Sequence, residues 1–270
     1  MIKNIRNKKY LVICLLFITL TGCFNATKNE LELKSDTNFC DFNKELIYKY
    51  DYYTKDGEQL YLRYIRKHSS NEWELEKEAT GDKIITEIKF KLFPDAIINS
   101  NQKKVTMEYI AANGDIASWS MTGYYSKKDS IWFHPPRGYI FKILEHTPFP
   151  SVKKPYKIGT TWKQSVTIPS EGWSDARWKT WEGEITTNST FEIVDIRKEK
   201  TAFGMIDCVV IDSKAVSRVG STELKMFFNP TYGFVKLAYK NIDDSIINLT
   251  LVSFEDMDPS VIEEDIPMDH

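Results

Sequence analysis

Alternation of apolar and polar residues with a period of two runs through most of the chain and limits its fold more than any other feature. In residues 45–53, ELIYKYDYY, every second residue from Leu46 is apolar or aromatic, and in residues 83–93, KIITEIKFKLF, charged residues alternate with Ile, Phe and Leu. Side chains of a strand point alternately to the two faces of a sheet, so this pattern predicts strands with one buried face. Only residues 94–102, PDAIINSNQ, could hold a short helix.

Turn sequences divide the alternating stretches into hairpins. Asn113-Gly114 is a strong hairpin signal, because both residues readily adopt the positive φ angles of a two-residue turn. The further strands predicted in this way cover residues 59–65, 104–110, 115–121, 160–168, 178–186, 190–196, 206–211, 222–228, 234–240 and 245–254. Residues 41–257 are therefore predicted to form a single all-β domain of long antiparallel hairpins, a large curved sheet or partial barrel with very little helix.

One segment interrupts this pattern. Residues 133–159 contain five prolines, at positions 135, 136, 148, 150 and 155. Proline lacks the N–H that a central strand needs, so the segment is predicted to be edge or irregular structure. It separates an N-terminal from a C-terminal set of hairpins and is the expected site of a long crossover.

The N-terminus has the features of a secretory signal. Lys3, Arg6, Lys8 and Lys9 precede an apolar run of eleven residues, 10–20. That run is shorter than the roughly 20 residues that span a membrane as a helix, and the combination is typical of a signal peptide.

The residues that follow, LTGC at 20–23, resemble the lipobox of bacterial lipoproteins. The resemblance implies that Cys23 receives a diacylglyceryl group, that residues 1–22 are removed, and that residues 23–40 form a flexible tether. Two or more acyl chains anchor a protein stably. The expected location is the cell envelope, with the outer membrane favoured and the domain in the periplasm or on the cell surface; an ordinary cleaved signal is the alternative.

Charge argues against several kinds of partner. The chain has 36 Lys and Arg against 38 Asp and Glu residues, and without residues 1–22 it keeps 32 against 38, a net charge of −6. Nucleic-acid binding needs a basic stripe, so no nucleic-acid partner is expected. Docking to anionic lipid by charge is disfavoured in the same way. The acidic residues 258–270 have no strand or helix period and are predicted to be a flexible tail.

Cys40 and Cys208 remain once Cys14 leaves with the signal and Cys23 is acylated. Disulfides persist in an oxidising envelope compartment, so these two could be bridged. The alternative for Cys208, within the apolar residues 206–211, is a small buried strand residue. Two cysteines cannot complete a structural zinc site, and we expect neither a metal nor a cofactor.

A second resemblance covers roughly residues 155–255. The order of a G-x-x-W strand, a strand with a central cysteine and a YGFVK strand is similar to uncharacterised secreted all-β proteins of bacterial envelopes. The matching residues are Gly159, Trp162, Gly204, Cys208, Phe228, Pro230, Tyr232, Gly233, Phe234, Val235 and Lys236. Some of these proteins look like the half-barrel of the lipoprotein-localisation factors, which hold acyl chains on a concave sheet under lid helices. This chain departs from that pattern because it offers almost no lid helix.

Three tryptophans within residues 171–184, EGWSDARWKTWEGE, form a candidate binding feature. Trp173 is expected in a loop, where it could line a cleft for a glycan or another amphiphile together with Trp178 or Trp181. In the predicted strand 178–186, Trp178 and Trp181 point to opposite faces. The structural alternative, which we favour, buries Trp181 in the core and places Trp178 at an edge.

The proline-rich segment holds the other candidate. His134, Arg137, Glu145 and His146 could bind an anionic ligand, and two histidines with a glutamate could bind a metal, but no fixed spacing identifies a site. Exposed or turn-stabilising roles are the simpler interpretation. Loops on a rigid scaffold often carry function, however.

No recognisable catalytic motif is present, so we expect a protein that is not an enzyme. The favoured hypothesis is a membrane-anchored envelope lipoprotein whose β-sheet binds a hydrophobic, amphiphilic or glycan ligand. The first alternative is a structural or assembly subunit of an outer-membrane complex with an envelope protein partner. The second is a hydrolase of envelope polymers, which would need both histidines, Glu145 and Arg137 in one cleft.

Overall fold

The computed structural model describes residues 39–65, 72–99 and 101–257, and the description below is limited to them. The predicted signal peptide 1–22, the acylation site Cys23 and the predicted tail 258–270 lie outside these residues. Within the described part, no helix combines the length and the apolar character needed to cross a membrane.

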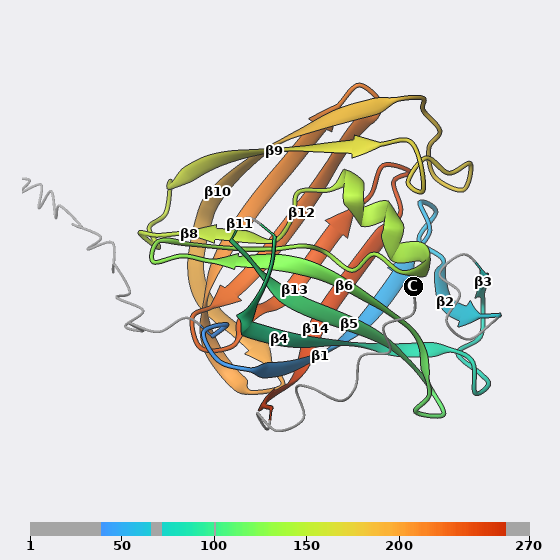
Figure 1. Cartoon of the computed structure of the whole chain (residues 1–270), viewed down its shortest axis with the longest axis horizontal. Helices are drawn as coiled ribbons and strands as arrows, with labels where there is room; N and C mark the ends of the chain where they lie inside the picture. Colours follow the sequence, from blue (N-terminus) through green and yellow to red (C-terminus); the bar gives the residue numbers. More distant parts are fainter. Residues whose placement is uncertain (1–38, 66–71, 100, 258–270) are drawn as a thin grey trace, which may run out of the picture. The chain divides into compact units, whose positions relative to one another are not determined.

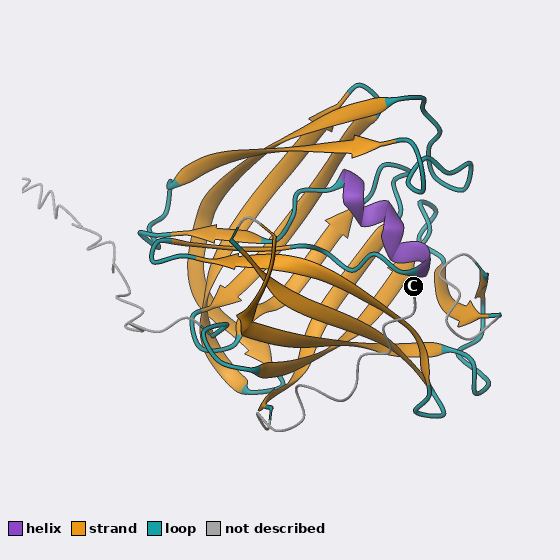
Figure 2. Cartoon of the chain, in the orientation of Figure 1, coloured by secondary structure: helices purple, strands orange, loops and turns teal. Residues whose placement is uncertain are grey.

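The described residues form a single all-β domain, as predicted, with one short 3₁₀ helix (Figure 1, Figure 2). The strands of the first half are β1 (Lys44–Tyr53), β2 (Gln59–Tyr64), β3 (Trp73–Glu76), β4 (Ile85–Asn99), β5 (Gln102–Ala111), β6 (Ile116–Ser126) and β7 (Ser130–Phe133). The helix η1 (Tyr139–His146) follows. The strands of the second half are β8 (Ser151–Lys153), β9 (Thr161–Pro169), β10 (Glu184–Thr201), β11 (Gly204–Ser217), β12 (Gly220–Asn229), β13 (Gly233–Lys240) and β14 (Ile246–Asp256).

Twelve strands form one antiparallel path in the order β8-β7-β6-β5-β4-β1-β14-β13-β12-β11-β10-β9, and β2 with β3 extends from β1. The path curls until its two end strands, β8 and β9, face each other (Figure 1). There the Nε1 of Trp162 and the Nε2 of Gln164 donate hydrogen bonds to the Oγ of Ser151, at 3.2 and 3.0 Å. In a closed barrel, backbone hydrogen bonds would join these two end strands. Here side-chain hydrogen bonds join them instead.

Alternation sets the two faces of the sheet. Leu46, Tyr48 and Tyr52 of β1 are buried as expected, while Lys89 and Lys91 on the outer face of β4 pair with carboxylates of neighbouring strands. Part of the pattern shifts at the start of β4, where a bulge at residues 85–87 interrupts the pairing with β5. As a result Ile84 and Ile85 are both buried and Thr86, expected inside, is exposed.

The proline-rich segment forms irregular structure after β7 and contains the edge strand β8, as predicted, and its helix covers the concave face of the sheet (Figure 2). Seven of the eight residues of η1 are buried. Phe141 packs on Tyr50 of β1 and Tyr109 of β5, with ring centroids 5.2 and 5.8 Å apart. The segment enters the interior at Arg137 and Gly138, whose backbone N–H groups donate to the hydroxyl of Tyr109 at 2.9 and 2.6 Å.

The helix prediction was wrong in position. Residues 94–102 belong to β4, the turn after it and the start of β5, and the helix lies at Tyr139–His146 instead. Within η1, Lys142, Glu145 and His146 are spaced as one face of a helix, so its sequence does carry a helical pattern, which the prediction missed.

The strand predicted at residues 178–186 was also wrong at its start. Residues 170–183 form turns that include Gly172 and Gly183 at φ values of +78° and +67°, and β10 begins at Glu184. Trp178 is 7% exposed in the main core, so its predicted place at an edge was wrong. Trp181, also 7% exposed, packs in a small separate cluster, so its burial was predicted correctly.

Both remaining cysteines are buried free thiols, so the Cys40–Cys208 disulfide is not formed in the structure. Cys40 lies beside Tyr124 of β6, whose hydroxyl donates to the Cys40 carbonyl at 3.1 Å. Cys208 lies on β11, opposite Arg197 of β10. Burial raises the pKa of both thiols to about 12. Phe39 and Cys40, expected at the end of the tether, belong to the core instead.

Replacing Tyr109 by phenylalanine should destabilise the domain. The hydroxyl is the acceptor for two backbone N–H groups, and a buried N–H left unpaired costs roughly 1–3 kcal/mol. We expect urea unfolding of Tyr109→Phe to show a loss of about 1–3 kcal/mol. Tyr53→Phe, a partly exposed tyrosine of β1, is the control and should change little; equal losses in both variants would contradict the anchoring role.

Candidate functional site

The open seam between β8 and β9 contains a cleft of about 680 Å³, called the seam cleft below. One wall is β9, the other is formed by β7, β8 and the segment between them, and the turn after β9 closes one end. The lining residues are Gln102, Tyr125, Lys127, Ser130, Ile131, Trp132, His134, Arg137, Glu145, Phe149, Ser151, Lys153, residues 162–169 and Trp173.

The free edge of β9 forms a whole wall of the cleft. Eight consecutive residues, 162–169, line it. Successive side chains of a strand point to opposite faces, so consecutive residues can share one cleft only when the edge of the strand faces it. On the other side β9 pairs with β10 along its full length. The cleft therefore presents backbone N–H and C=O groups of an edge strand, which can bind a polar ligand.

Aromatic rings provide the flat surfaces of the cleft. Trp162 of β9 is fixed by parallel stacking on Phe191 of β10, with centroids 5.1 Å apart and planes 4° from parallel. Trp132 of β7 packs on Phe149, with centroids 5.6 Å apart. Trp173 projects from the turn after β9, and the guanidinium of Arg137 lies 4.7 Å from its ring centroid. Such rings are rigid platforms for flat apolar faces of a ligand.

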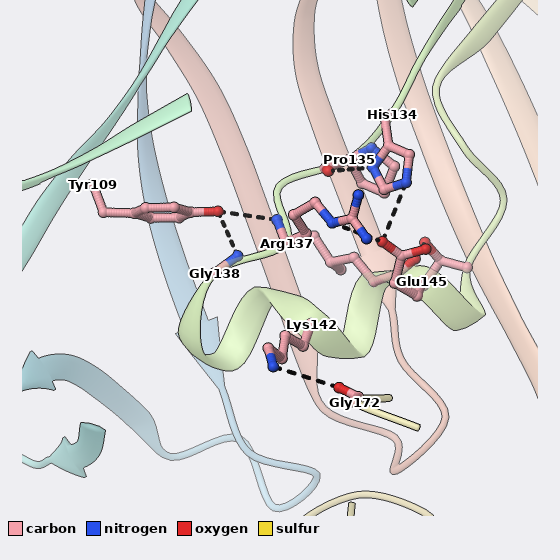
Figure 3. Close-up of polar contacts among 10 residues, drawn as sticks. Tyr109, His134, Pro135, Arg137, Gly138, Lys142, Glu145 and Gly172 are labelled. Carbon is pink, nitrogen blue, oxygen red and sulfur yellow. Dashed lines mark hydrogen bonds and ion pairs between the residues drawn. The ribbon is translucent and has the colours of Figure 1, made fainter. Parts of the chain in front are cut away.

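A largely buried polar group of His134, Arg137 and Glu145 lines the cleft, and Figure 3 shows its contacts. The Nε2 of His134 lies 3.2 Å from the Oε1 of Glu145, and the Nε of Arg137 lies 3.7 Å from the same oxygen. The Nδ1 of His134 lies 2.9 Å from the carbonyl oxygen of Pro135. A carbonyl can only accept, so Nδ1 carries the proton of a neutral imidazole and Nε2 faces Glu145 as an acceptor.

Burial controls the charges of this group. It raises the pKa of Glu145 to about 7, against the opposing effect of Arg137, and lowers the pKa of His134 to about 4. His134 is therefore neutral at pH 7, while Glu145 is divided between its two forms. A protonated Glu145 can donate to Nε2 of His134, and an ionised Glu145 is compensated by Arg137. The group can thus store or release one proton inside the cleft.

Four of the residues singled out in the sequence meet here: His134, Arg137, Glu145 and Trp173. Two others do not. The ring of His146 packs edge-on against Trp181, with centroids 4.6 Å apart, and burial lowers its pKa to about 4. The indole N–H of Trp178 donates to the carbonyl of Trp173 at 3.1 Å, so Trp178 supports the turn instead of lining the cleft.

Sequence reasoning missed much of the lining, including Trp132, Phe149 and the β9 residues Trp162 and Gln164. The alternation in these strands predicts which side chains point inward and which point outward. It does not show which strands lie at the ends of the sheet. Proline in the 133–159 segment was the available signal for an edge. No group of three His, Cys, Asp or Glu side chains within residues 39–65, 72–99 and 101–257 is placed to hold a metal ion, because His146 is turned away.

Comparison with known proteins gives no family. No protein-family model matches the chain, and no curated protein matches it. Among solved structures, a predicted lipoprotein from Parabacteroides distasonis is 11% identical with a TM-score of 0.47, over 82% of this chain and 100% of that one. A predicted exported protein with a YmcC-like fold from Bacteroides fragilis is 9% identical with a TM-score of 0.39, over 81% and 100%.

The hypothetical lipoprotein YmcC from Escherichia coli is 10% identical with a TM-score of 0.34, over 78% of this chain and 84% of that one. With so little similarity, function has to be argued from the residues of this chain.

Replacing Glu145 by glutamine should change how stability depends on pH. A carboxyl whose pKa rises from 4.5 to about 7 on folding contributes stability that is fully present below pH 4.5 and is lost as the pH rises through 7. The change corresponds to about 3 kcal/mol. Relative to wild type, Glu145→Gln should therefore gain up to about 3 kcal/mol between pH 4.5 and pH 8 in urea unfolding.

His134 and His146 are present in both proteins, so their contributions cancel in this difference. Glu192→Gln removes an exposed carboxylate of β10 and serves as the control, with the same stability difference expected at both pH values. A pH-independent difference for Glu145→Gln would contradict the buried, proton-holding role.

Proposed function

We propose that this chain is a cell-envelope lipoprotein, tethered through acylated Cys23, whose β-domain binds a glycan in the seam cleft without reacting with it. One observation carries the proposal: the cleft combines flat aromatic rings with the hydrogen-bonding edge of β9. Sugar rings have apolar faces and hydroxyl edges, and they need both kinds of partner. Trp173 and Trp162 would stack on the ring faces, while Gln164, Ser151 and the backbone of β9 would bind hydroxyl groups.

The packing of the interior favours a glycan over an acyl chain. A lipid carrier holds its acyl chains in a large apolar cavity, but η1 fills the concave face of this sheet with seven buried residues. The hollow beside Phe39, Tyr48, Phe133 and Phe234 has about 10 Å³, about the space that one water molecule needs. The seam cleft opens instead to the outer side of the domain.

The residues of the cleft favour binding over hydrolysis. Most glycoside hydrolases use a pair of carboxyl groups on either side of the scissile bond. Among the described residues that line the seam cleft, Glu145 is the sole carboxylate. The hydrolase hypothesis also required His146 in the cleft, and its ring packs against Trp181.

Replacing Cys23 by alanine should release the protein from membranes. The lipobox at residues 20–23 supports acylation of this cysteine, and two or more acyl chains would hold the domain stably at a membrane. We expect fractionation to move Cys23→Ala from the membrane pellet to the soluble fraction, with loss of palmitate labelling. Cys208→Ala is the matched control and should stay in the pellet; retention of Cys23→Ala would exclude the anchor.

Replacing Trp173 by alanine should weaken glycan binding by about tenfold, which is about 1.4 kcal/mol. The measurement is a microarray of bacterial envelope glycans followed by fluorescence titration of the best binder. Trp119→Ala removes a tryptophan that is 37% exposed on β6, outside the cleft, and should leave affinity unchanged. Absence of binding to any glycan would favour the assembly role, and turnover of a bound glycan would favour the hydrolase.

A further inference from the structure

The charges around the seam cleft differ from those of the chain as a whole. The cleft is lined by Lys127, Arg137, Lys153 and Lys163 against one carboxylate, Glu145, although the whole chain has a net charge of −2. A slightly acidic protein therefore concentrates positive charge at this cleft. Local charge of this kind attracts ligands of the opposite sign.

Two of these lysines lie on opposite lips of the seam, that is, on the two end strands β8 and β9 that border it. Lys153 is the last residue of β8 and Lys163 is the third residue of β9, and both are exposed. Three other lysines of the sheet pair with carboxylates across strands: Lys89 with Glu45, Lys91 with Glu108 and Lys236 with Glu199. Within the described residues no such carboxylate pairs with Lys153 or Lys163. Their charge is therefore available to a ligand lying along the seam.

Arg137 provides a third cation, deeper in the cleft. Its guanidinium stacks on Trp173 at 4.7 Å and its Nε lies 3.7 Å from Glu145. The stacking holds the group in one plane, and its side chain remains 31% exposed to the cleft. A planar guanidinium binds carboxylate, phosphate or sulfate through two parallel hydrogen bonds.

We propose that the glycan of the seam cleft is acidic, and that Arg137 binds its anionic groups while Lys153 and Lys163 guide the chain along the two lips. This inference rests on the proposed function and adds the substrate class to it. Neutral sugars would use the aromatic rings and the edge of β9 equally well but would leave Lys153 and Lys163 without a partner of opposite charge.

The buried group makes this binding depend on pH. An anion bound at Arg137 competes with the ionised form of Glu145, so the protonated form favours binding. His134 and Arg137 contact this carboxyl, and the other charged or titratable described residues that line the cleft are Tyr125 and three lysines, none of them a carboxylate. His134 stays neutral above its pKa of about 4. Affinity for an acidic glycan should therefore rise as the pH falls from 8 to 6, and Glu145→Gln should flatten that dependence.

The test compares three matched pairs of polymers with the full-length acylated protein in a polyoxyethylene detergent. The pairs are polygalacturonate and its methyl ester, carboxymethyl cellulose and hydroxyethyl cellulose, and dextran sulfate and dextran. Tryptophan fluorescence reports binding at a fixed ionic strength of about 0.15 M, where distant charges are screened. We expect the acidic member of at least one pair to bind tenfold or more tightly than its neutral partner.

Charge-reversing variants then locate the effect. Lys153→Glu combined with Lys163→Glu should weaken acidic binding tenfold or more and leave binding of neutral polymers unchanged. Lys49→Glu combined with Lys200→Glu reverses two exposed lysines on β1 and β10, outside the cleft, and is the control. Both double variants change exposed or partly exposed strand residues, and their melting temperatures check that they are folded.

Each outcome decides between the two proposals. Equal affinity for acidic and neutral members would overturn the acidic-ligand inference and leave glycan binding in place. Acidic binding that falls equally in both double variants would be non-specific attraction and would also overturn it. No binding of any polymer would overturn the inference together with the proposed function.

Discussion

Filling of the concave sheet by its own chain is the constraint on which the rest of this structure depends. A curled sheet buries one face only if something packs against it, and here the segment between β7 and β8 provides that cover. Phe141 packs between Tyr50 and Tyr109, and the Tyr109 hydroxyl binds the backbone where the segment enters. The domain therefore needs neither a second sheet nor a bound lipid to complete its core.

The same segment also builds the candidate site. It leaves β7 at His134, passes through the interior as η1, and returns as β8 on the opposite lip from β9. His134, Arg137 and Glu145 are consequently held by core packing, yet they line a cleft that opens outward. A rigid scaffold of this kind keeps binding groups in position before the ligand arrives, which lowers the entropy that binding costs. It also explains how a carboxyl can be buried enough for a pKa of about 7 and still face a ligand.

The strands were predictable because each needs only local information. Alternation at Leu46, Tyr48 and Tyr52, and the turn at Asn113-Gly114, follow from which residues fit a half-buried strand or a positive φ angle. The helix and the tryptophan turn were not predictable in this way. Within residues 139–146, Lys142, Glu145 and His146 have helical spacing, but so short a pattern does not show which distant sheet the helix covers. Trp178 fits a strand pattern, although its indole N–H donates to the backbone of Trp173 in a turn. Both depend on partners that lie far away or in an irregular turn.

By itself the sequence determined the all-β class, the position of most strands, the proline-rich interruption and the resemblance of residues 20–23 to a lipobox. These properties follow from residue types, spacing and backbone chemistry, which act over a few residues. Tertiary structure alone decided that β8 and β9 end the sheet side by side, that His134, Arg137 and Glu145 meet while His146 turns to Trp181, and that Cys40 and Cys208 stay apart. The reason is that strand order and burial depend on which distant faces pack together. Alternation within a single strand shows which side chains share a face, but it does not show which strands are its neighbours.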